Sequence, residues 1–217
     1  MKIRYFNPAF IDTASSLMNE FKDDTSNTLL VLGYYYYGGT YEDLARGYDH
    51  VIIFNQENYF YLSTKPYFNN VLDGYLKADE VWDYSENNIP LFAQHGIKSS
   101  LHILKPYMKW DAFAPVEKDI DILIYGSQHS RRSNLVEFLR KKYNVVYLDG
   151  VFGDALDDYI LRSRILLNCH SSSELVMEQE QARMVKWLGA PCQIVSERSP
   201  KNYLNVPEMD YWELFCL

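Results

Sequence analysis

The segment DIDILIYGSQHSRR, residues 119–132, places a strand, a glycine turn and the start of a helix in direct succession. Residues 121–125 (DILIY) form an almost continuous apolar run, which is typical of a strand buried in a parallel sheet. Gly126 ends this run, and a helical pattern of apolar residues occupies 131–143. A strand that leads straight into a helix predicts a crossover connection, and therefore a parallel sheet.

The same alternation extends from this segment to both ends of the chain. Toward the C-terminus, strands are expected at 144–148, 165–168 and 193–195, and helices at 154–163 and 174–188. Toward the N-terminus, strands are expected at 3–6, 28–33, 51–54, 80–83 and 101–104, and helices at 10–21, 67–76 and 85–95. Residues 105–118, which include Pro106 and Pro115, are typical of a linker. We therefore predict an α/β fold with two Rossmann-like lobes, residues 1–107 and 108–217.

Composition narrows the class of protein. The 217 residues include 21 Lys and Arg against 29 Asp and Glu, so the net charge is −8. This acidity disfavours a general binder of nucleic acid or of anionic membranes. A hydrophobic content of 47% with 23% charged residues is that of a globular domain and excludes disorder and coiled coils. The 19 tyrosines are the unusual feature.

The cysteine pattern and the length of the apolar runs indicate the cellular compartment and whether the chain spans a membrane. The three cysteines form no CxxC pair and no Cys/His cluster, which disfavours a disulfide framework or a zinc site. The longest apolar run, residues 29–37, is far shorter than the ~20 residues that span a bilayer. We expect no membrane span and a cytoplasmic location, in the host cytoplasm if the protein is viral.

Ligands of parallel sheets bind at the carboxyl ends of the strands, which directs attention to the loop after 121–125. Gly126 allows close approach of a ligand, and Ser127 offers a hydroxyl. Arg131 and Arg132 begin the next helix, where the helix dipole is already positive. Two arginines suit this place if an anion such as phosphate binds there. The alternative, two solvated surface arginines, remains open.

Other strand-end loops carry further candidates. His170 follows the strand at 165–168, and Glu180 and Arg183 lie three residues apart on a predicted helix. These residues suit a phosphate and ribose site, or equally a helix cap and a surface ion pair. Glu57 and Glu86 are candidate general bases, although single carboxylates are more often caps.

The sequence Asp119-Ile120-Asp121 spells the DxD pattern of metal-dependent sugar transferases. It precedes its strand, at the wrong edge of the sheet for a ligand site, so we predict no metal there. No other grouping of His, Asp and Glu has metal-ligand spacing, and we expect no required cofactor.

The loop after residues 28–33 contains four consecutive tyrosines, followed by Gly38 and Gly39. Tyrosine combines a flat apolar face with a polar tip, which suits sugars, bases and protein surfaces alike. Tyr35, Tyr36, Gly38 and Gly39 are therefore our candidates for binding a ligand of one of these kinds. A loop packed over the core is the alternative.

Several segments, taken together, resemble a family. Residues 119–132 resemble the D-DVLFYGS-N-RR opening of the C-terminal lobe in GT-B-like glycosyltransferases of the group 1 type. The likeness continues, in the same order as in that family, through FNQEN (54–58), VWDYSENNIPLFAQHGI (81–97, with the WDYSxxNI pattern), VFGDALDDYILRSRILLNCH (151–170), EQAR (180–183) and IVSE (194–197).

The resemblance implies a minimal GT-B-like arrangement in which the C-terminal lobe holds a nucleotide-sugar without a metal. Gly126, Ser127, Arg131 and Arg132 would lie beside the diphosphate or the sugar. His170, Glu180 and Arg183 would contact donor phosphate, sugar or ribose, and Glu197 would lie near the nucleoside. The chain departs from the family in its short lobes and in Gln128-His129.

The expected activity is transfer of a hexosyl or pentosyl group from a nucleotide-sugar, a UDP-sugar, to an acceptor hydroxyl. The candidate residues for acceptor binding are Tyr35, Tyr36, Gly38 and Gly39. The acceptor is left open among a glycan, a small molecule and hydroxymethylated bases of viral DNA. Residues 95–145 contain nine Lys and Arg against five Asp and Glu, a net charge of +4 that could meet a phosphate backbone. A nucleotide-binding or interaction module without catalysis is the alternative from another functional class.

Overall fold

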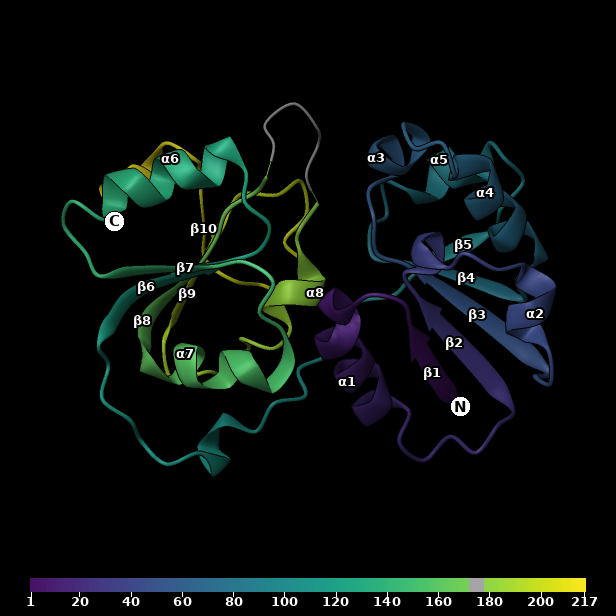
Figure 1. Cartoon of the computed structure of the whole chain (residues 1–217), viewed down its shortest axis with the longest axis horizontal. Coiled ribbons are helices and arrows are strands. Elements are labelled where there is room, and N and C mark those ends of the chain that lie inside the picture. The colour runs from purple at the N-terminus through teal and green to yellow at the C-terminus, as the bar shows by residue number, and fades with distance from the viewer. Residues whose placement is uncertain (172–177) are drawn as a thin grey trace. The chain divides into compact units, whose positions relative to one another are not determined.

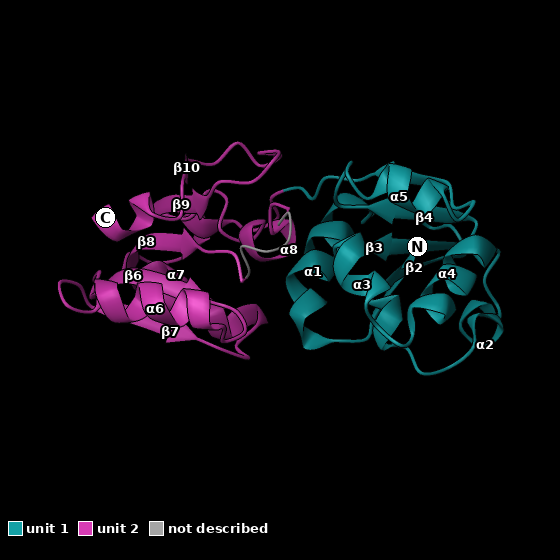
Figure 2. Ribbon diagram, turned by 90° about the horizontal axis from the view of Figure 1, so that it is seen from above, with its two compact units in different colours: residues 1–105 teal, residues 106–217 magenta. Residues whose placement is uncertain are grey.

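The computed structural model describes residues 1–171 and 178–217. The chain forms two compact units, residues 1–105 and 106–217 (Figure 2). Each unit contains one five-stranded parallel sheet. The change from one unit to the next lies two residues before the boundary drawn from the sequence.

The sheet of unit 1 follows chain order, β1-β2-β3-β4-β5 (Figure 1). Its strands are β1 (Lys2–Tyr5), β2 (Thr28–Leu32), β3 (His50–Asn55), β4 (Glu80–Asp83) and β5 (Ser99–Leu101). All five residues of β2 are buried, so both of its faces are covered. This explains why the strand is a continuous apolar run rather than an alternating one.

The helices of unit 1 are short. They are α1 (Ile11–Glu20), α2 (Tyr41–Ala45), α3 (Tyr59–Ser63), α4 (Phe68–Lys77) and α5 (Ile89–Ala93), with 3-10 turns η1 (Pro8–Phe10) and η2 (Tyr34–Tyr36). The sequence did not predict α2 and α3, which begin at the side-chain caps Thr40 and Asn58. Of the helix predicted at 85–95, only α5 (Ile89–Ala93) is helical, because the polar residues before it form a turn.

Strand β5 begins at Ser99, two residues before the predicted start, and ends at Leu101. Its register on β4 pairs Val81 with Ser99 and Asp83 with Leu101. The short β4 can therefore pair with no more than this stretch, and the chain leaves the sheet after Leu101.

The sheet of unit 2 has a different winding, β10-β9-β8-β6-β7. Its strands are β6 (Ile120–Tyr125), β7 (Val145–Leu148), β8 (Ser163–Asn168), β9 (Gln193–Glu197) and β10 (Glu208–Met209). The order reverses at β6, which lies between β7 and β8. Helices α6 (Ser130–Leu139) and α7 (Asp157–Arg162) lie on opposite faces of this sheet (Figure 1).

The side chains on the two faces of β6 pack into two separate hydrophobic cores. Leu123 and Tyr125 pack with Trp187 in one cluster, and Ile122 and Ile124 pack with Leu135 in the other. Alternate residues of a strand point to opposite faces, so a strand buried on both sides must be apolar throughout. Trp110, in the 3-10 turn η3 (Trp110–Ala112), is buried in the first core, so the predicted linker belongs to unit 2 from residue 106 onward.

The helix predicted at 174–188 is wrong in its described part. Residues 174–177 lie outside the described residues, and only α8 (Gln181–Met184) is helical, before a turn. Four consecutive side chains, Met184 to Trp187, are at most 1% exposed. A surface helix buries one face only, so this run requires a tighter, irregular path through the core.

The remaining predicted helix, 154–163, is divided into η4 (Gly153–Leu156) and α7.

The acids of the DxD pattern lie at the amino end of β6. Asp119 pairs with Arg162 at 2.6 Å, and Asp121 pairs with Arg164 at 3.4 Å. Among the described residues, no helix combines the length and the apolar character needed to cross a bilayer.

Candidate functional site

The reversal of strand order in unit 2 brings the loops after β6 and β8 together at the carboxyl edge of the sheet. Such a reversal opens a crevice in which α/β proteins bind ligands. Gly126 occupies this edge with a φ of 129°. A Cβ atom at Gly126 would lie 2.6 Å from Nη2 of Arg183 and 3.1 Å from Nη1 of Arg132. Glycine is therefore required, because two guanidinium groups fill the space beside the loop.

Arg132 is the most deeply buried of the predicted arginines, with a side chain 1% exposed. Its Nε donates to the carbonyl oxygen of Cys169 at 2.7 Å, and Nη1 donates to that of Ser127 at 2.9 Å. Its Nη2 donates to Oε1 of Glu180 at 3.0 Å. Arg132 thus ties the β6 loop, the end of β8 and Glu180 together, and it positions this edge of the sheet.

Arg183 shares Glu180 with Arg132. Its guanidinium forms an ion pair with that carboxylate and donates to Oδ1 of Asn168 at 2.8 Å. Burial by itself would raise the pKa of Glu180, but Arg183 and Arg132 hold this pKa below its usual value. Glu180 is therefore ionised at neutral pH, and Arg183, 17% exposed, keeps part of its surface open.

Arg131 is held by a second carboxylate, that of Glu197 at the end of β9. Both terminal nitrogens donate to Glu197, Nη1 also donates to the carbonyl oxygen of His170 at 3.2 Å, and the guanidinium stacks 3.6 Å from the Tyr211 ring. The Glu197 carboxylate in turn accepts the backbone N–H of His170 at 2.8 Å. The predicted residues Arg131, His170 and Glu197 are thus direct neighbours.

His170 is 3% exposed. Its Nε2 lies 3.3 Å from the carbonyl oxygen of Arg198 and 3.4 Å from Oγ of Ser199. Its Nδ1 is buried and has no hydrogen-bond partner among the described residues. A buried polar atom without a partner is destabilising, which makes Nδ1 a place where a ligand oxygen or a water would be favoured.

The structure gathers all eight predicted donor residues along this edge, although not all are accessible. Three guanidinium groups face two carboxylates, so one net positive charge remains when His170 is neutral. The side chain of Ser127 is exposed, while its carbonyl oxygen accepts from Arg132 and from the hydroxyl of Tyr147 at 3.0 Å.

Two features of this edge were missed by the sequence analysis. Tyr211, distant in sequence, supports Arg131, and its hydroxyl donates to the carbonyl oxygen of that residue at 2.9 Å. Cys169 is fully buried, and burial raises the pKa of its thiol to about 12. The thiol is protonated at neutral pH, so Cys169 is no nucleophile.

In unit 1, the carboxyl edge contains a network of amide and backbone groups around one carboxylate, that of Asp83. Asp83, fully buried, accepts Nδ2 of Asn55 at 2.8 Å, Nδ2 of Asn88 at 3.0 Å and the N–H of Ser85 at 2.9 Å. The same two amides donate to the carbonyl oxygen of Glu57, at 2.9 and 3.0 Å. The segments FNQEN and WDYSENN are therefore parts of one network, a role that their sequences alone did not assign.

The candidate bases occupy different places in this network. The backbone of Glu57 is clamped by Asn55 and Asn88, and its Oε1 accepts the N–H of Asn58 at 3.0 Å. Burial, and then the charge of Glu57, raise the pKa of the Tyr35 phenol well above its usual value. The charge of Glu57 thus acts on a predicted acceptor residue, whereas Glu86 lies half-buried in the loop between β4 and α5.

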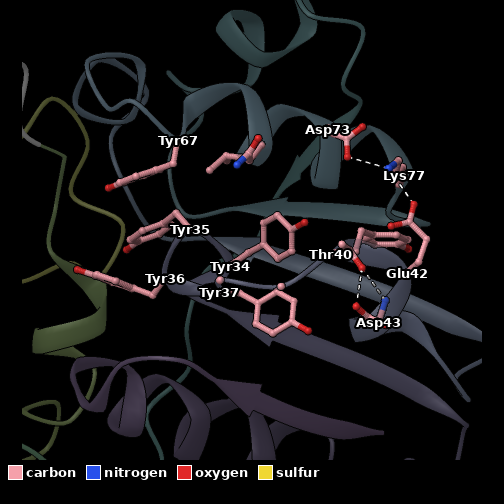
Figure 3. A pocket seen from close by; sticks show the side chains of 15 residues that line it. Tyr34, Tyr35, Tyr36, Tyr37, Thr40, Glu42, Asp43, Tyr67, Asp73 and Lys77 are labelled. Carbon is pink, nitrogen blue, oxygen red and sulfur yellow. Dashed lines mark hydrogen bonds and ion pairs between the residues drawn. The ribbon is translucent and has the colours of Figure 1, made fainter.

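Tyr35, Tyr36, Gly38 and Gly39 line a pocket of about 660 Å³ at the carboxyl end of β2 (Figure 3). The conformation of Gly33, with a φ of 67°, turns the chain from β2 into η2 and so orients the tyrosines. Tyr35 is 9% exposed and Tyr36 is 53% exposed. The predicted tyrosine loop therefore both packs over the core and forms a wall of the pocket.

Comparison with known proteins gives structural similarity only. No protein-family model matches the chain, and no curated protein matches its sequence. The chain is similar to the apo structure of OtsA, with a TM-score of 0.53 and 9% identity over 94% of this chain and 67% of that one.

Two further structures are similar to the same degree. One is described as trehalose-6-phosphate from E. coli bound with UDP-2-fluoro glucose, with a TM-score of 0.53 and 10% identity over 93% of this chain and 66% of that one. The other is an alpha,alpha-trehalose-phosphate synthase (UDP-forming) from Burkholderia vietnamiensis, with a TM-score of 0.50 and 7% identity over 94% and 68%.

The chain spans about two thirds of the length of each of these proteins. Identities of 7–10% establish the fold alone. The predicted fold class, α/β with two Rossmann-like lobes and parallel sheets, is confirmed.

Proposed function

We propose that this chain is a glycosyltransferase that moves a sugar from a UDP-sugar to an acceptor hydroxyl. The observation that carries the proposal is the cluster of Arg131, Arg132 and Arg183 at the point where the strand order of unit 2 reverses. This cluster retains a net positive charge, and beside it lies Nδ1 of His170, which has no hydrogen-bond partner within residues 1–171 and 178–217. A diphosphate supplies the negative charge and the oxygen atoms that such a cluster favours.

The roles of the other unit 2 residues follow from their contacts. Gly126 has no side chain and so lets Arg132 and Arg183 lie against the loop, and a diphosphate and sugar bound to these arginines would lie beside Gly126 and Ser127. Glu180, held ionised by two arginines, would accept ribose hydroxyls. Glu197, at the end of β9, would face the nucleoside. The similar structure bound with UDP-2-fluoro glucose supports a UDP-sugar as the donor class.

In the proposed reaction, the bond between the anomeric carbon and the diphosphate oxygen breaks, and its electron pair stays on the diphosphate. The acceptor oxygen forms the new bond to that carbon, and its proton passes to a carboxylate. Glu57 is our first candidate for this base and Glu86 the second. The guanidinium groups would stabilise the charge that develops on the leaving diphosphate, a task that does not require a metal ion.

The donor assignment is tested by calorimetric titration of UDP into the wild type and into Arg131→Ala and Arg183→Ala. Loss of a charge-assisted hydrogen bond is worth about 1.5–3 kcal/mol, so each variant is expected to bind UDP about 10- to 100-fold more weakly. Arg140→Ala is the matched control, because Arg140 is an exposed arginine at the far end of α6. Unchanged affinity in both site variants would contradict the assignment.

Catalysis is tested separately by following free sugar released from a panel of UDP-sugars, with and without EDTA. Slow hydrolysis of one donor that persists in EDTA is expected. UDP binding without turnover of any donor would identify a nucleotide-binding module instead. Before the panel is assayed, a thermal shift selects the donor, since a ligand at 100 times its Kd adds about 2.7 kcal/mol of stability.

A further inference from the structure

The pocket of unit 1 is large enough for an organic ligand. Its volume of about 660 Å³ lies within the range of about 300–1,000 Å³ that is usual for ligand pockets. At one end Tyr35, Tyr36 and Tyr67 extend side by side, and Tyr34 and Tyr37 lie in the middle (Figure 3). The charged side chains of the pocket, those of Glu42, Asp43, Asp73 and Lys77, lie at the other end (Figure 3). The pocket therefore offers aromatic faces and hydrogen-bonding groups in separate regions.

The aromatic faces are held in place before any ligand arrives. Tyr34 lies against α4, where a Cβ atom at Gly74 would come within 2.1 Å of its ring. The Tyr37 ring lies 4.7 Å from that of Phe6, and the Tyr35 ring lies 4.6 Å from that of Tyr36. Rigid rings lose little conformational entropy on binding, so they suit stacking against a flat apolar surface.

The charged end is acidic, but its carboxylates already have cationic partners. Nζ of Lys77 lies 2.8 Å from both Glu42 and Asp73, and Nη2 of Arg46 lies 2.8 Å from Asp43. Hydrogen bonds to Asp73 and Glu42 raise the pKa of Lys77, and the bond to Lys77 lowers the pKa of Glu42. Lys77 and Glu42 are therefore both ionised at neutral pH.

This charge distribution selects among ligands. A phosphate backbone would face three carboxylates, while the single lysine of the pocket is already occupied. A cationic ligand would have to compete with Lys77 and Arg46 for those carboxylates. A neutral polyhydroxyl compound suits both ends, because its hydroxyls donate to carboxylates and accept from the ammonium, and its apolar ring faces stack on tyrosines.

We propose that this pocket binds a neutral carbohydrate, and that this carbohydrate is the acceptor of the transfer reaction. The proposal rests on the proposed function, and it selects a glycan over the hydroxymethylated bases of DNA. Burial raises the pKa values of Tyr35, Tyr36 and Tyr67, which line the tyrosine end of the pocket, and the charge of Glu57 adds to each rise, so the candidate base acts electrostatically on this end.

The test measures binding to the full chain without donor, by saturation-transfer NMR and calorimetry. The probes are maltose, cellobiose and lactose, the polyamine spermidine, and a short DNA duplex containing hydroxymethylcytosine. At least one disaccharide is expected to bind, with an affinity that changes little with salt. Binding of spermidine or of the duplex without any disaccharide, or no binding at all, would overturn the proposal.

Variants locate the binding in the pocket. Tyr37→Ala and Tyr67→Ala, both at half-buried positions, are each expected to weaken disaccharide binding about fivefold to tenfold, because each removes a stacking face. Tyr5→Ala is the matched control, since Tyr5 is 42% exposed on β1 and does not line the pocket. Equal loss in Tyr5→Ala, or no loss in either pocket variant, would place the saccharide elsewhere and overturn the proposal.

UDP titration in parallel separates the two proposals. Disaccharide binding at the pocket together with UDP binding supports both. Disaccharide binding without UDP binding leaves a saccharide site but contradicts the glycosyltransferase and, with it, the acceptor role. UDP binding without disaccharide binding contradicts the pocket assignment alone.

Discussion

Strands β3 and β8 both end in a fully buried asparagine, Asn55 in unit 1 and Asn168 in unit 2. Asn55 belongs to a network of amides and backbone groups around Asp83, with the hydroxyl of Tyr75 donating to its Oδ1 at 3.0 Å. Asn168 donates to Oγ of Ser196 at 3.0 Å and accepts from Arg183 at 2.8 Å. Each asparagine anchors the carboxyl edge of its sheet, but the neighbours differ in charge.

The difference shows that the strand order of a sheet and the residues of its loops together determine the charge at its carboxyl edge. In unit 2 the strand order reverses, and three arginines and two glutamates meet where it does. In unit 1 the strands follow chain order, and tyrosines and amides dominate the edge. The cationic edge suits a diphosphate, and the tyrosine-lined edge suits an uncharged ligand. The following experiments measure how much stability each unit loses when the arginine–glutamate network of unit 2 or the Asp83 network of unit 1 is disrupted.

The largest effect is expected for Arg132→Met. Removal of one partner from a buried ion pair such as Arg132–Glu180 destabilises a protein by about 3–5 kcal/mol, and here two hydrogen bonds to carbonyl oxygens are lost as well. Urea unfolding measures this change. The exposed Arg140→Met should change the free energy of unfolding by less than about 0.5 kcal/mol. A small effect of Arg132→Met would mean that the edge of unit 2 does not depend on this network.

Gly126→Ala is expected to be the next most severe. The substitution places a Cβ atom 2.6 Å from Arg183 at a φ of 129°, so strain and overpacking together should destabilise unit 2 by about 2–4 kcal/mol. Gly38→Ala is the matched control in unit 1, since a Cβ there meets nothing within 4 Å. Equal melting temperatures for the two variants would contradict the close packing of the arginines on Gly126.

Asp83→Asn tests the edge of unit 1. The new amide presents one oxygen and one NH₂ group to three donors, so a donor is left unpaired at a cost of about 1–3 kcal/mol. Denaturant unfolding measures the loss. The exposed Asp73→Asn serves as the control for removal of a carboxylate. If Asp83→Asn is as stable as the wild type, the network does not hold Glu57 in place.

The smallest effect expected is a difference in the response of the two units to acid. Burial lowers the pKa of His102, which stacks on Trp82, below 6.5. The folded chain therefore binds this proton less readily than the unfolded chain, and unit 1 loses stability as pH falls below about 6.5, until His102 is protonated in the folded state too. Glu180 has a lowered pKa, so its contribution to unit 2 is complete above about 4.5 and is lost as pH falls further.

Urea unfolding at a series of pH values measures both steps. His102→Phe, which keeps a ring against Trp82, should remove the step near pH 6.5, and Glu180→Gln should remove the one below pH 4.5. A His102→Phe variant with an unchanged step would show that another group causes it.

Apolar runs made most of the fold predictable. Runs such as 28–33 and 121–125 predicted buried parallel strands, and their alternation with helical patterns predicted two lobes. The short helices α2 and α3 escaped prediction because five-residue helices show too little periodicity. The helix predicted at 174–188 failed in its described part, where α8 ends at Met184. Beyond it Lys186 is buried, with Nζ donating to the carbonyl oxygen of Gly153 at 2.6 Å. Nothing in the local pattern identified a lysine inside the core.

The sequence by itself determined the fold class and a set of site residues, because strand runs, glycine turns and polar strand ends are local features of the chain. Only the tertiary structure decided which of those residues are accessible. Arg131 and Arg132 are adjacent in sequence, yet one stacks on Tyr211 and the other is buried against Cys169 and Glu180. Ion pairs and ring stacking join residues that are distant along the chain, so their partners depend on strand order and on packing, which no local pattern records.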